Sequence, residues 1–285
     1  MKPASFEYHA PGTADEAVSL LAEFAERGGR VIAGGQSLVP MMAFRLARPS
    51  HLIDINRIAG LDRLSVEAGT LHIGARVRHA DIESATDGGT LGRLLREVAR
   101  SVAHPPIRNR GTFCGSLAHA DPSAEWCLVA ATLDASIVAR STRGPRIVPA
   151  SDFFLGVMTT SLAADELLME CRISLLVDDA RYGFYEVSRR AGDFAMAAAL
   201  VTYRLSGGRI TDPRLGLGGV ETFPRRLSNV EAMLAGATPG DESFCAAAEA
   251  AAASIDPMED AHTTSDFRRQ LVHAVTSRAL ERSLS

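Results

Sequence analysis

Cysteine is scarce in this 285-residue chain, and its four cysteines are far apart in the sequence. They are Cys114, Cys127, Cys171 and Cys245, so no Cys-x-x-Cys pair is present. Structural zinc sites and iron–sulfur clusters draw on closely spaced thiolates. The sequence therefore predicts no metal site of these kinds within the chain, and it favours reduced thiols in a cytoplasmic protein.

Positive charge and long apolar runs are also lacking. The net charge is −4 and no block of lysine and arginine occurs, which argues against a nucleic-acid partner. No run approaches the roughly 18 apolar residues of a membrane span. The segment Met1–Glu7 has no apolar core of a secretory signal. These absences predict a cytoplasmic globular protein, long enough for two or three modules.

The most informative segment present is the turn that follows the apolar run Val31–Ala33, which is predicted to be a buried strand. Adjacent glycines let a ligand approach the backbone closely, and consecutive amides can form a concave anion site. We therefore expect the amides of Gly34, Gly35, Gln36 and Ser37 to bind a pyrophosphate. A plain tight turn is the alternative. The spacing fits neither a dinucleotide fingerprint nor a P-loop.

A second stretch of the same kind is Gly111–Ser116, which offers backbone approach and the hydroxyls of Thr112 and Ser116. A run of small residues leads from it to Asp121, which is predicted to cap a helix that has proline at its first position. Glu125 lies one helical turn further on and could accept hydrogen bonds from sugar or ribityl hydroxyls. The alternatives are a simple cap at Asp121 and a solvated helix residue at Glu125.

Several reactive side chains are better explained by structure than by catalysis. Cys114 is expected to be a small buried thiol among glycines, and His119 a turn residue. His104 at a helix end and the pair Arg189–Arg190 are given structural roles as well. No nucleophile–histidine–carboxylate arrangement is apparent, so no catalytic side chain is predicted.

The periodicity of apolar residues predicts mixed α/β structure to about residue 175 and a smaller α+β module beyond it. In the first part, the expected helices are a capped helix after Thr13–Glu16, then 38–46, 90–102 and one opened by Asp121, and the expected strands are 31–33, 51–55, 64–67, 71–74, 136–139, 146–148 and 167–173. The second part is expected to contain strands 182–189, 195–205 and 210–220 and helices 241–254 and 265–283.

An ordered set of motifs spans nearly the whole chain. Its pieces are Ala33–Pro40, Leu52–Ile55, Ile107–Thr112 with Gly115–Ala118, Asp121–Glu125, Asp165–Leu168 and Arg189–Ala195. Together they resemble the FAD-binding medium subunits of the molybdenum hydroxylases, a family that includes carbon monoxide dehydrogenase and xanthine dehydrogenase. Two departures are visible: Thr112–Gly115 reads Thr-Phe-Cys-Gly where the family usually has Thr-Ile-Gly-Gly, and Tyr185-Glu186 replaces a lysine.

The resemblance implies an α+β fold. It consists of a two-lobed FAD-binding domain of the vanillyl-alcohol-oxidase (PCMH) type at 1–175, with lobes of about 1–57 and 58–175. A C-terminal α+β domain of the CO dehydrogenase flavoprotein type, a three-stranded sheet with helices, would follow at 176–285. The implied FAD contacts are Ile32, Ala33, Gly34, Gly35, Gln36, Ser37, Leu38, Ala103, Gly111, Thr112, Cys114, Gly115, Ser116, Asp121, Glu125, Leu168 and Phe194.

The resemblance also implies electron relay. A large molybdenum-cofactor subunit would oxidise the substrate, and a small [2Fe–2S] subunit would pass electrons to this FAD and on to an external acceptor. Two copies of this heterotrimer would assemble. The alternatives are a stand-alone FAD-dependent oxidoreductase of the same fold and a non-enzymatic nucleotide-binding assembly subunit.

Overall fold

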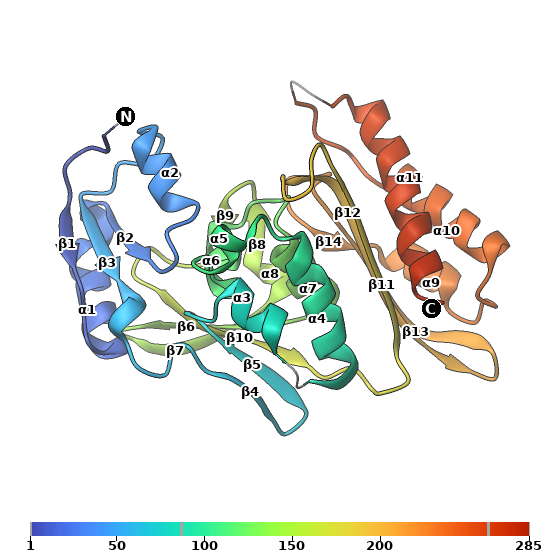
Figure 1. Ribbon diagram of the computed structural model, residues 1–285, viewed down its shortest axis with the longest axis horizontal. Helices are drawn as coiled ribbons and strands as arrows, with labels where there is room; N and C mark the ends of the chain where they lie inside the picture. Colours follow the sequence, from blue (N-terminus) through green and yellow to red (C-terminus); the bar gives the residue numbers. More distant parts are fainter. Residues whose placement is uncertain (1, 86–87, 261–262, 285) are drawn as a thin grey trace.

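The structure is a computed structural model that describes residues 2–85, 88–260 and 263–284. Its three larger sheets follow one another along the long axis of the molecule in sequence order, from the blue N-terminal elements to the red C-terminal helices (Figure 1). Among the described residues, no helix is long and apolar enough to cross a membrane.

The first sheet is parallel, with strand order β1-β3-β2. Its strands are β1 (Glu7–His9), β2 (Gly29–Ile32) and β3 (His51–Asp54), and its helical segments are α1 (Ala14–Phe24), η1 (Ala25–Arg27), α2 (Leu38–Ala43) and η2 (Ile55–Arg57). The predicted cap of α1 is confirmed, because Thr13 Oγ1 accepts from the Glu16 amide at 3.2 Å. The short strand β1 carries too little pattern to have been predicted.

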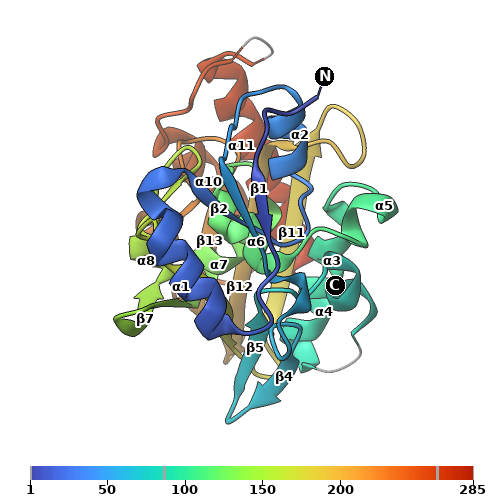
Figure 2. The same ribbon diagram turned by 90° about the vertical axis from the view of Figure 1, so that its left-hand side faces the viewer.

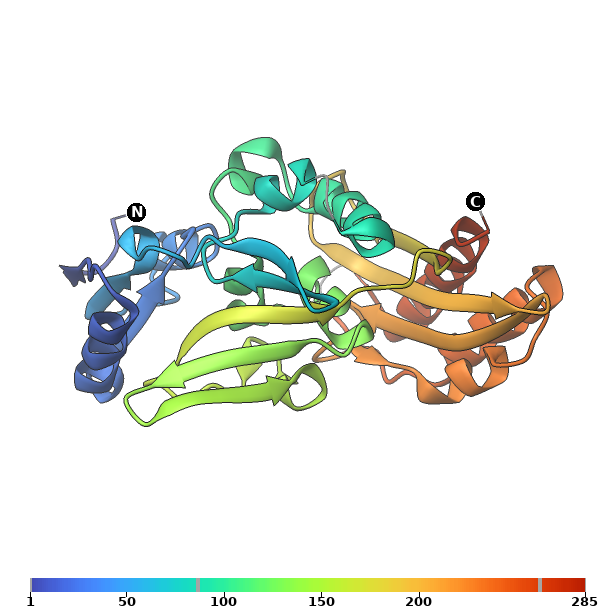
Figure 3. The same ribbon diagram turned by 90° about the horizontal axis from the view of Figure 1, so that it is seen from below.

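The second sheet is antiparallel, with strand order β4-β5-β10-β6-β7. Its strands are β4 (Leu64–Glu67), β5 (Thr70–Gly74), β6 (Ser136–Ser141), β7 (Gly144–Pro149) and β10 (Leu167–Ser174). The helical side holds α3 (His79–Ser84), α4 (Gly89–Ser101), α5 (Pro105–Arg108), α6 (Phe113–His119) and α7 (Glu125–Thr132). Figure 3 shows the strands in front of α6 and α7. The segment after β7 forms α8 (Ala150–Phe153), β8 (Phe154–Gly156) and β9 (Thr159–Thr160).

From Phe113 onward, the second glycine stretch forms the start of α6. One prediction for the segment that follows was wrong. Asp121 was expected to cap the next helix, but α7 begins at Glu125 after Ala124. The Asp121 side chain instead accepts from the Ser123 amide at 2.9 Å. This local turn competes with helix initiation and delays the helix.

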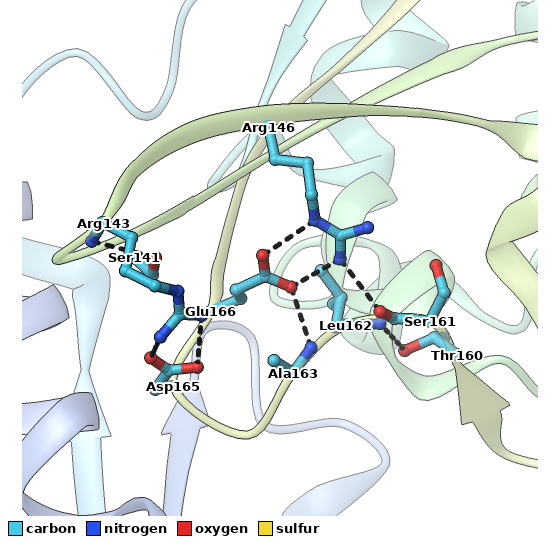
Figure 4. A network of polar contacts seen from close by, with 9 residues as sticks. All are labelled: Ser141, Arg143, Arg146, Thr160, Ser161, Leu162, Ala163, Asp165 and Glu166. Carbon is cyan, nitrogen blue, oxygen red and sulfur yellow. Dashed lines mark hydrogen bonds and ion pairs between the residues drawn. The ribbon is translucent and has the colours of Figure 1, made fainter.

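Ion pairs fix the tip of the β6–β7 hairpin against the turn before β10 (Figure 4). Arg143 pairs with Asp165, and Arg146 pairs with both oxygens of Glu166, at 2.9 and 2.6 Å. The Glu166 carboxylate also accepts from the Ala163 amide at 2.8 Å. The hydrogen bond from Arg146 lowers the pKa of Glu166. Part of the Asp165–Leu168 motif thus has a structural role.

The third sheet has the order β11-β12-β13-β14 and is antiparallel. Its strands are β11 (Arg181–Ser188), β12 (Ala195–Ser206), β13 (Arg209–Gly218) and β14 (Arg225–Arg226), and its helices are α9 (Ser228–Leu234), α10 (Asp241–Ala253) and α11 (Ser265–Arg282). The expected three strands and two helices are present. The additional β14 and α9 are too short to show a periodic pattern.

Strand β12 joins the third sheet to the rest of the molecule, because its two faces belong to different cores. Ala197, Ala199 and Val201 pack in the cluster that includes α11. Ala198 and Leu200 pack in the cluster that includes α7 and the second sheet. This alternation is the period of two that a strand imposes. The third sheet is therefore held firmly beside α7.

Candidate functional site

A cavity of about 590 Å³ lies where the first sheet meets α6. Figure 2 shows the first sheet standing in front of α6. The side chains and backbone that line the cavity include Ile32, Ala33, Gly34, Gly35, Gln36, Ser37, Leu38, His79, Gly111, Thr112, Gly115, Ser116 and Met158. The two glycine stretches, separated by more than seventy residues in the sequence, thus contribute to one site.

Gly34 shows how closely the two stretches approach. A Cβ atom built on Gly34 would lie 2.1 Å from the Arg110 carbonyl oxygen and 2.8 Å from Gly111 Cα. Both neighbours are backbone atoms, so they cannot rotate away as a side chain would. Only glycine fits here, and the contact holds the first turn against the second stretch.

The first turn presents unpaired donors to the cavity. Gly35 has φ +71°, a backbone conformation that favours glycine. Among the described residues, the amides of Gly35, Gln36 and Ser37 have no hydrogen-bond acceptor. The Gln36 side chain donates to the Gly34 carbonyl at 3.0 Å, which steadies the turn. Consecutive amides without acceptors suit an anion such as a pyrophosphate.

Asn56 and Arg78 connect the first turn to the second stretch through hydrogen bonds. Asn56 Nδ2 donates to the Ala33 carbonyl at 2.7 Å, and Arg78 donates to Asn56 Oδ1 at 2.6 Å. A second nitrogen of Arg78 donates to the Arg110 carbonyl. Burial, and then the nearby Arg110, lowers the pKa of Arg78. One guanidinium therefore ties the strand before the first turn to the loop before α6.

The second stretch satisfies its own backbone. Thr112 Oγ1 accepts from the Gly115 amide at 3.0 Å and so caps α6. Ser116 lines the cavity. Cys114 does not, because its thiol donates to the Ile73 carbonyl at 3.3 Å and is buried. Burial also raises the pKa of this thiol well above its usual value, in accord with the expected inert, buried cysteine.

His79 adds a neutral hydrogen-bond donor to the cavity. Its Nδ1 accepts from Trp126 Nε1 at 2.9 Å, so the other ring nitrogen, Nε2, carries the proton. A Cβ atom on Gly111 would lie 2.5 Å from that Nε2, so the absence of a side chain at Gly111 leaves room for it. Burial, followed by Arg78 and Arg108, lowers the pKa of His79 to about 4. The ring is therefore uncharged near neutral pH.

Besides Cys114, five predicted FAD contacts lie outside this cavity. The loop 189–194 packs on Ala103, since a Cβ atom on Gly192 would lie 2.9 Å from the Ala103 carbonyl oxygen. Phe194 in this loop is 63% exposed. Leu168 is buried in β10, beside a register shift. Asp121 and Glu125 precede and begin α7, and the Gly219 amide donates to the Pro122 carbonyl between them at 2.8 Å. Together, these contacts place Ala103, Phe194 and the Asp121–Glu125 segment at the junction where the second sheet and its helices meet the third sheet.

Glu125 faces Glu186 of β11 across this junction. Glu125 is only 7% exposed, and burial followed by the charge of Glu186 raises its pKa to about 8. Burial raises the pKa of Glu186 to about 7. Glu186 Oε2 is also buried without a hydrogen-bond partner among the described residues. This pair can therefore hold a proton near neutral pH, and Glu125 is not a solvated helix residue.

Comparison with known proteins shows which family the chain belongs to. Residues 4–174 match the FAD binding domain in molybdopterin dehydrogenase, and residues 182–283 match the CO dehydrogenase flavoprotein C-terminal domain. The chain belongs to the FAD-binding medium subunits of the molybdenum hydroxylases. This membership confirms the predicted family and fold, FAD as the cofactor, and the assignment to a multi-subunit oxidoreductase.

Individual members of the family match over almost their whole length. The 6-hydroxypseudooxynicotine dehydrogenase complex subunit alpha of Paenarthrobacter nicotinovorans is 37% identical, with 100% of this chain and 96% of the relative covered. The carbon monoxide dehydrogenase structure from Hydrogenophaga pseudoflava is 36% identical with a TM-score of 0.95, over 100% of this chain and 99% of that one. Quinoline 2-oxidoreductase from Pseudomonas putida 86 is 36% identical with a TM-score of 0.94, covering 99% and 98%.

Sequence reasoning missed three side chains at or beside this cavity: Asn56, Arg78 and His79. Asn56 follows the predicted strand 51–55 directly, and polar residues after a buried strand often serve a site, so this signal was available. Arg78 precedes the short helix α3, which begins at His79, and no local pattern marks either residue. Only the fold shows that Arg78 contacts Asn56 and Arg110 and that His79 faces Gly111.

Proposed function

We propose that this chain relays electrons within a molybdenum hydroxylase. It would take electrons from the [2Fe–2S] clusters of a small partner subunit and pass them through FAD to an external acceptor. The observation that carries the proposal is the turn at Gly35–Ser37, whose amides have no acceptor among the described residues and which lines a cavity together with Gly111, Thr112, Gly115 and Ser116. Such a turn fits the pyrophosphate of FAD.

The proposed FAD contacts form two groups. The amides of Gly35, Gln36 and Ser37 would hold the pyrophosphate, and His79 Nε2 would donate a hydrogen bond from the wall formed by Gly111. The flavin end would lie toward the junction that holds Ala103, Asp121, Glu125 and Phe194, and Leu168 of β10 remains a proposed contact. Cys114 is withdrawn from the proposed contacts, because its side chain points to Ile73.

Bound FAD supplies the redox chemistry, and the protein supplies binding, orientation and electrostatics. The residues of this chain hold the cofactor without moving a proton to or from an organic substrate. Glu186, with Tyr185, stands where the resemblance places a lysine, so Glu125 is paired with a buried acid rather than with a positive charge. This pair would disfavour further negative charge on a nearby group, which is a tuning role.

The proposed partners are a large molybdenum-cofactor subunit and a small [2Fe–2S] subunit, assembled as a dimer of heterotrimers in the cytoplasm. Relatives of this chain include a nicotine 6-hydroxylase medium subunit and a carbon monoxide dehydrogenase medium chain. All four cysteines of this chain are unpaired and distant in sequence, so the clusters must lie on another subunit. We also propose the division into 1–175, with lobes of about 1–57 and 58–175, and 176–285.

Native purification tests this function. We expect a complex that contains two further subunits, shows flavin absorbance with one FAD per copy of this chain, and has its FAD reduced by the organic substrate only when the large subunit is present. Native mass spectrometry gives the subunit composition, and rapid-scan absorbance gives the reduction. A chain that is found alone and oxidises a substrate unaided would show that the relay is wrong. A chain without flavin after FAD addition would remove any FAD-dependent function.

A further inference from the structure

Three ligand-type side chains meet on the first sheet, outside the FAD cavity. Glu7 and His9 belong to β1, and His51 begins β3. In the parallel register Glu7 is the partner of His51. Since residues two apart in a strand point to the same face, His9 shares the face of Glu7. The sheet therefore brings the Glu7 carboxylate and the His9 imidazole next to the His51 imidazole, which lies more than forty residues further along the sequence.

The ligand atoms converge on one point. His9 Nε2 lies 3.1 Å from His51 Nδ1, and His51 Nδ1 lies 3.7 Å from Glu7 Oε2. All three atoms lie within 4.8 Å of one another. In a tetrahedral zinc site with Zn–N bonds of about 2.0–2.1 Å, two ligand atoms stand roughly 3.3 Å apart. The two closest separations fall on either side of that value.

The hydrogen bonding of this cluster depends on a single proton. The carboxylate oxygen is an acceptor, and each neutral ring nitrogen either accepts or donates. One proton lies between His9 Nε2 and His51 Nδ1, on one ring or the other, while the Glu7 carboxylate, 3.7 Å from His51 Nδ1, is too far away to share it. A divalent cation in place of that proton would bind all three lone pairs at once.

Packing holds the two imidazoles in this arrangement before any ion binds. The Phe24 ring stacks on His51 at 3.9 Å and on His9 at 4.8 Å between ring centroids. Gly29 in the neighbouring strand makes room for Phe24, because a Cβ atom there would lie 2.9 Å from Phe24 Cβ. His51 is only 7% exposed. Two of the three ligands therefore lose little freedom on binding.

We propose that Glu7, His9 and His51 form a binding site for a zinc-type divalent cation. Two imidazoles and one carboxylate suit zinc and similar transition ions, whereas calcium and magnesium prefer oxygen ligands. The fourth position would be left to water. The ion would tie β1 to β3, near the start of the strand that ends at Asp54. The site is independent of the flavin function.

Zinc titration of the full-length chain tests this site. The FAD-loaded protein is treated with a chelator and titrated with Zn²⁺ by calorimetry in a Cys245→Ser background, because Cys245, Glu249 and His273 form a second cluster of ligand atoms. We expect one ion per chain with micromolar or tighter affinity. His9→Gln should weaken binding by at least about tenfold. The control His72→Gln removes a histidine that lies 3.4 Å from Glu170. It should leave the zinc affinity unchanged.

Glu7→Gln gives a second test that spares the fold, because the Glu7 side chain is 74% exposed. It should also weaken zinc binding while thermal unfolding without zinc stays as in the parent chain. Zinc affinity equal to that of the parent in both His9→Gln and Glu7→Gln would overturn the proposal. So would a parent chain that binds Zn²⁺ only in the millimolar range.

Discussion

At Gly35–Ser37 the chain turns with amides that find no acceptor among the described residues, whereas at Gly111–Ser116 it enters a helix whose N-terminus is capped by Thr112. Both stretches are rich in glycine and hydroxyl residues, and both line the same cavity. The sequence shows two similar motifs, and the structure gives them different tasks. The first keeps its amides free, as the proposed pyrophosphate contact requires, while the second supplies a wall whose donors are partly engaged.

The difference has an energetic consequence. A polar group that is withdrawn from water without a partner costs about 1–3 kcal/mol, so the free amides of Gly35–Ser37 are stable only beside water or a bound anion. The capped amide of Gly115 carries no such cost. FAD binding should therefore depend steeply on the geometry of the first turn and weakly on the cap of the second stretch.

Among the changes that test this comparison, Gly34→Ala should have the largest effect on FAD binding. The added methyl would overlap the Arg110 carbonyl, at 2.1 Å, and force the two stretches apart. We expect purified protein with almost no bound FAD, measured as flavin absorbance per chain. The control Gly156→Ala adds the same methyl where a Cβ atom meets no neighbour within 4 Å, and it should keep full flavin content. Normal flavin content in Gly34→Ala would mean that the contact between the two stretches does not shape the site.

Arg78→Gln should come next, because it removes the link between the stretches and leaves their residues in place. Asn56 Oδ1 and the Arg110 carbonyl lose a charged donor, at a cost of about 2 kcal/mol. If the loss appears in the bound state, FAD affinity falls roughly thirtyfold. Fluorescence titration of the FAD-free chain measures this.

The matched control for that change is Arg225→Gln. Arg225 also bridges a side chain and a carbonyl, Glu221 and Ser254, but in the C-terminal part of the molecule. It should lower the free energy of unfolding and leave FAD affinity unchanged. Equal FAD affinity in both variants would show that the Arg78 link is not needed for the site.

The pH dependence of stability near neutral pH should come from two residues outside both glycine stretches, Glu125 and Glu186. Burial raises the pKa values of Glu125 and Glu186 to about 8 and about 7, from about 4.3 in an unfolded chain. The native state therefore binds more protons, and the resulting stability is full below pH ~4.3 and is lost as the pH rises through these values. Between pH ~6.5 and ~8, the free energy of unfolding should fall by on the order of 2 kcal/mol.

Urea unfolding of the FAD-free chain at several pH values checks this slope. Glu186→Gln should flatten it, whereas Glu249→Gln, at an exposed position on α10, should not change it. His79 does not interfere above pH ~6.5, because its lowered pKa affects stability only below its usual value. If the free energy of unfolding stays constant or rises with pH over this interval, Glu125 and Glu186 do not hold the extra protons of the native state.

Much of the fold was predictable because its longer elements carry clear periodic patterns. The strands around 51–55 and 167–173 and the helices at 241–254 and 265–283 show a repeat of two or of three to four residues, and the structure has them close to the expected bounds. The elements that were missed, such as β1, β14 and α9, have between two and seven residues. Patterns that short do not distinguish a strand or helix from a loop.

The site was less predictable, since it depends on contacts between distant segments. That Gly34 touches Arg110 follows from the packing of the first sheet against α6, and no local signal shows it. The same holds for His79 facing Gly111 and for His9 meeting His51. Cys114 is the opposite case: its position in a family motif suggested a cofactor contact, but the helical turn of α6 points its thiol toward Ile73.

Thr112→Ala should have the smallest effect on FAD affinity. It tests most directly how the two glycine stretches differ. Losing the cap of α6 costs about 1 kcal/mol of unfolding free energy, while it frees the Gly115 amide toward the cavity and makes the second stretch resemble the first. FAD affinity should therefore change by no more than about twofold. Thr264→Ala removes an equivalent cap from α11, where Thr264 accepts from the Phe267 amide at 3.3 Å, and it should show the same loss of stability with unchanged FAD affinity. If Thr112→Ala instead loses its flavin as completely as Gly34→Ala, the threonine hydroxyl itself contacts the cofactor, and both glycine stretches, rather than the first alone, hold the phosphates.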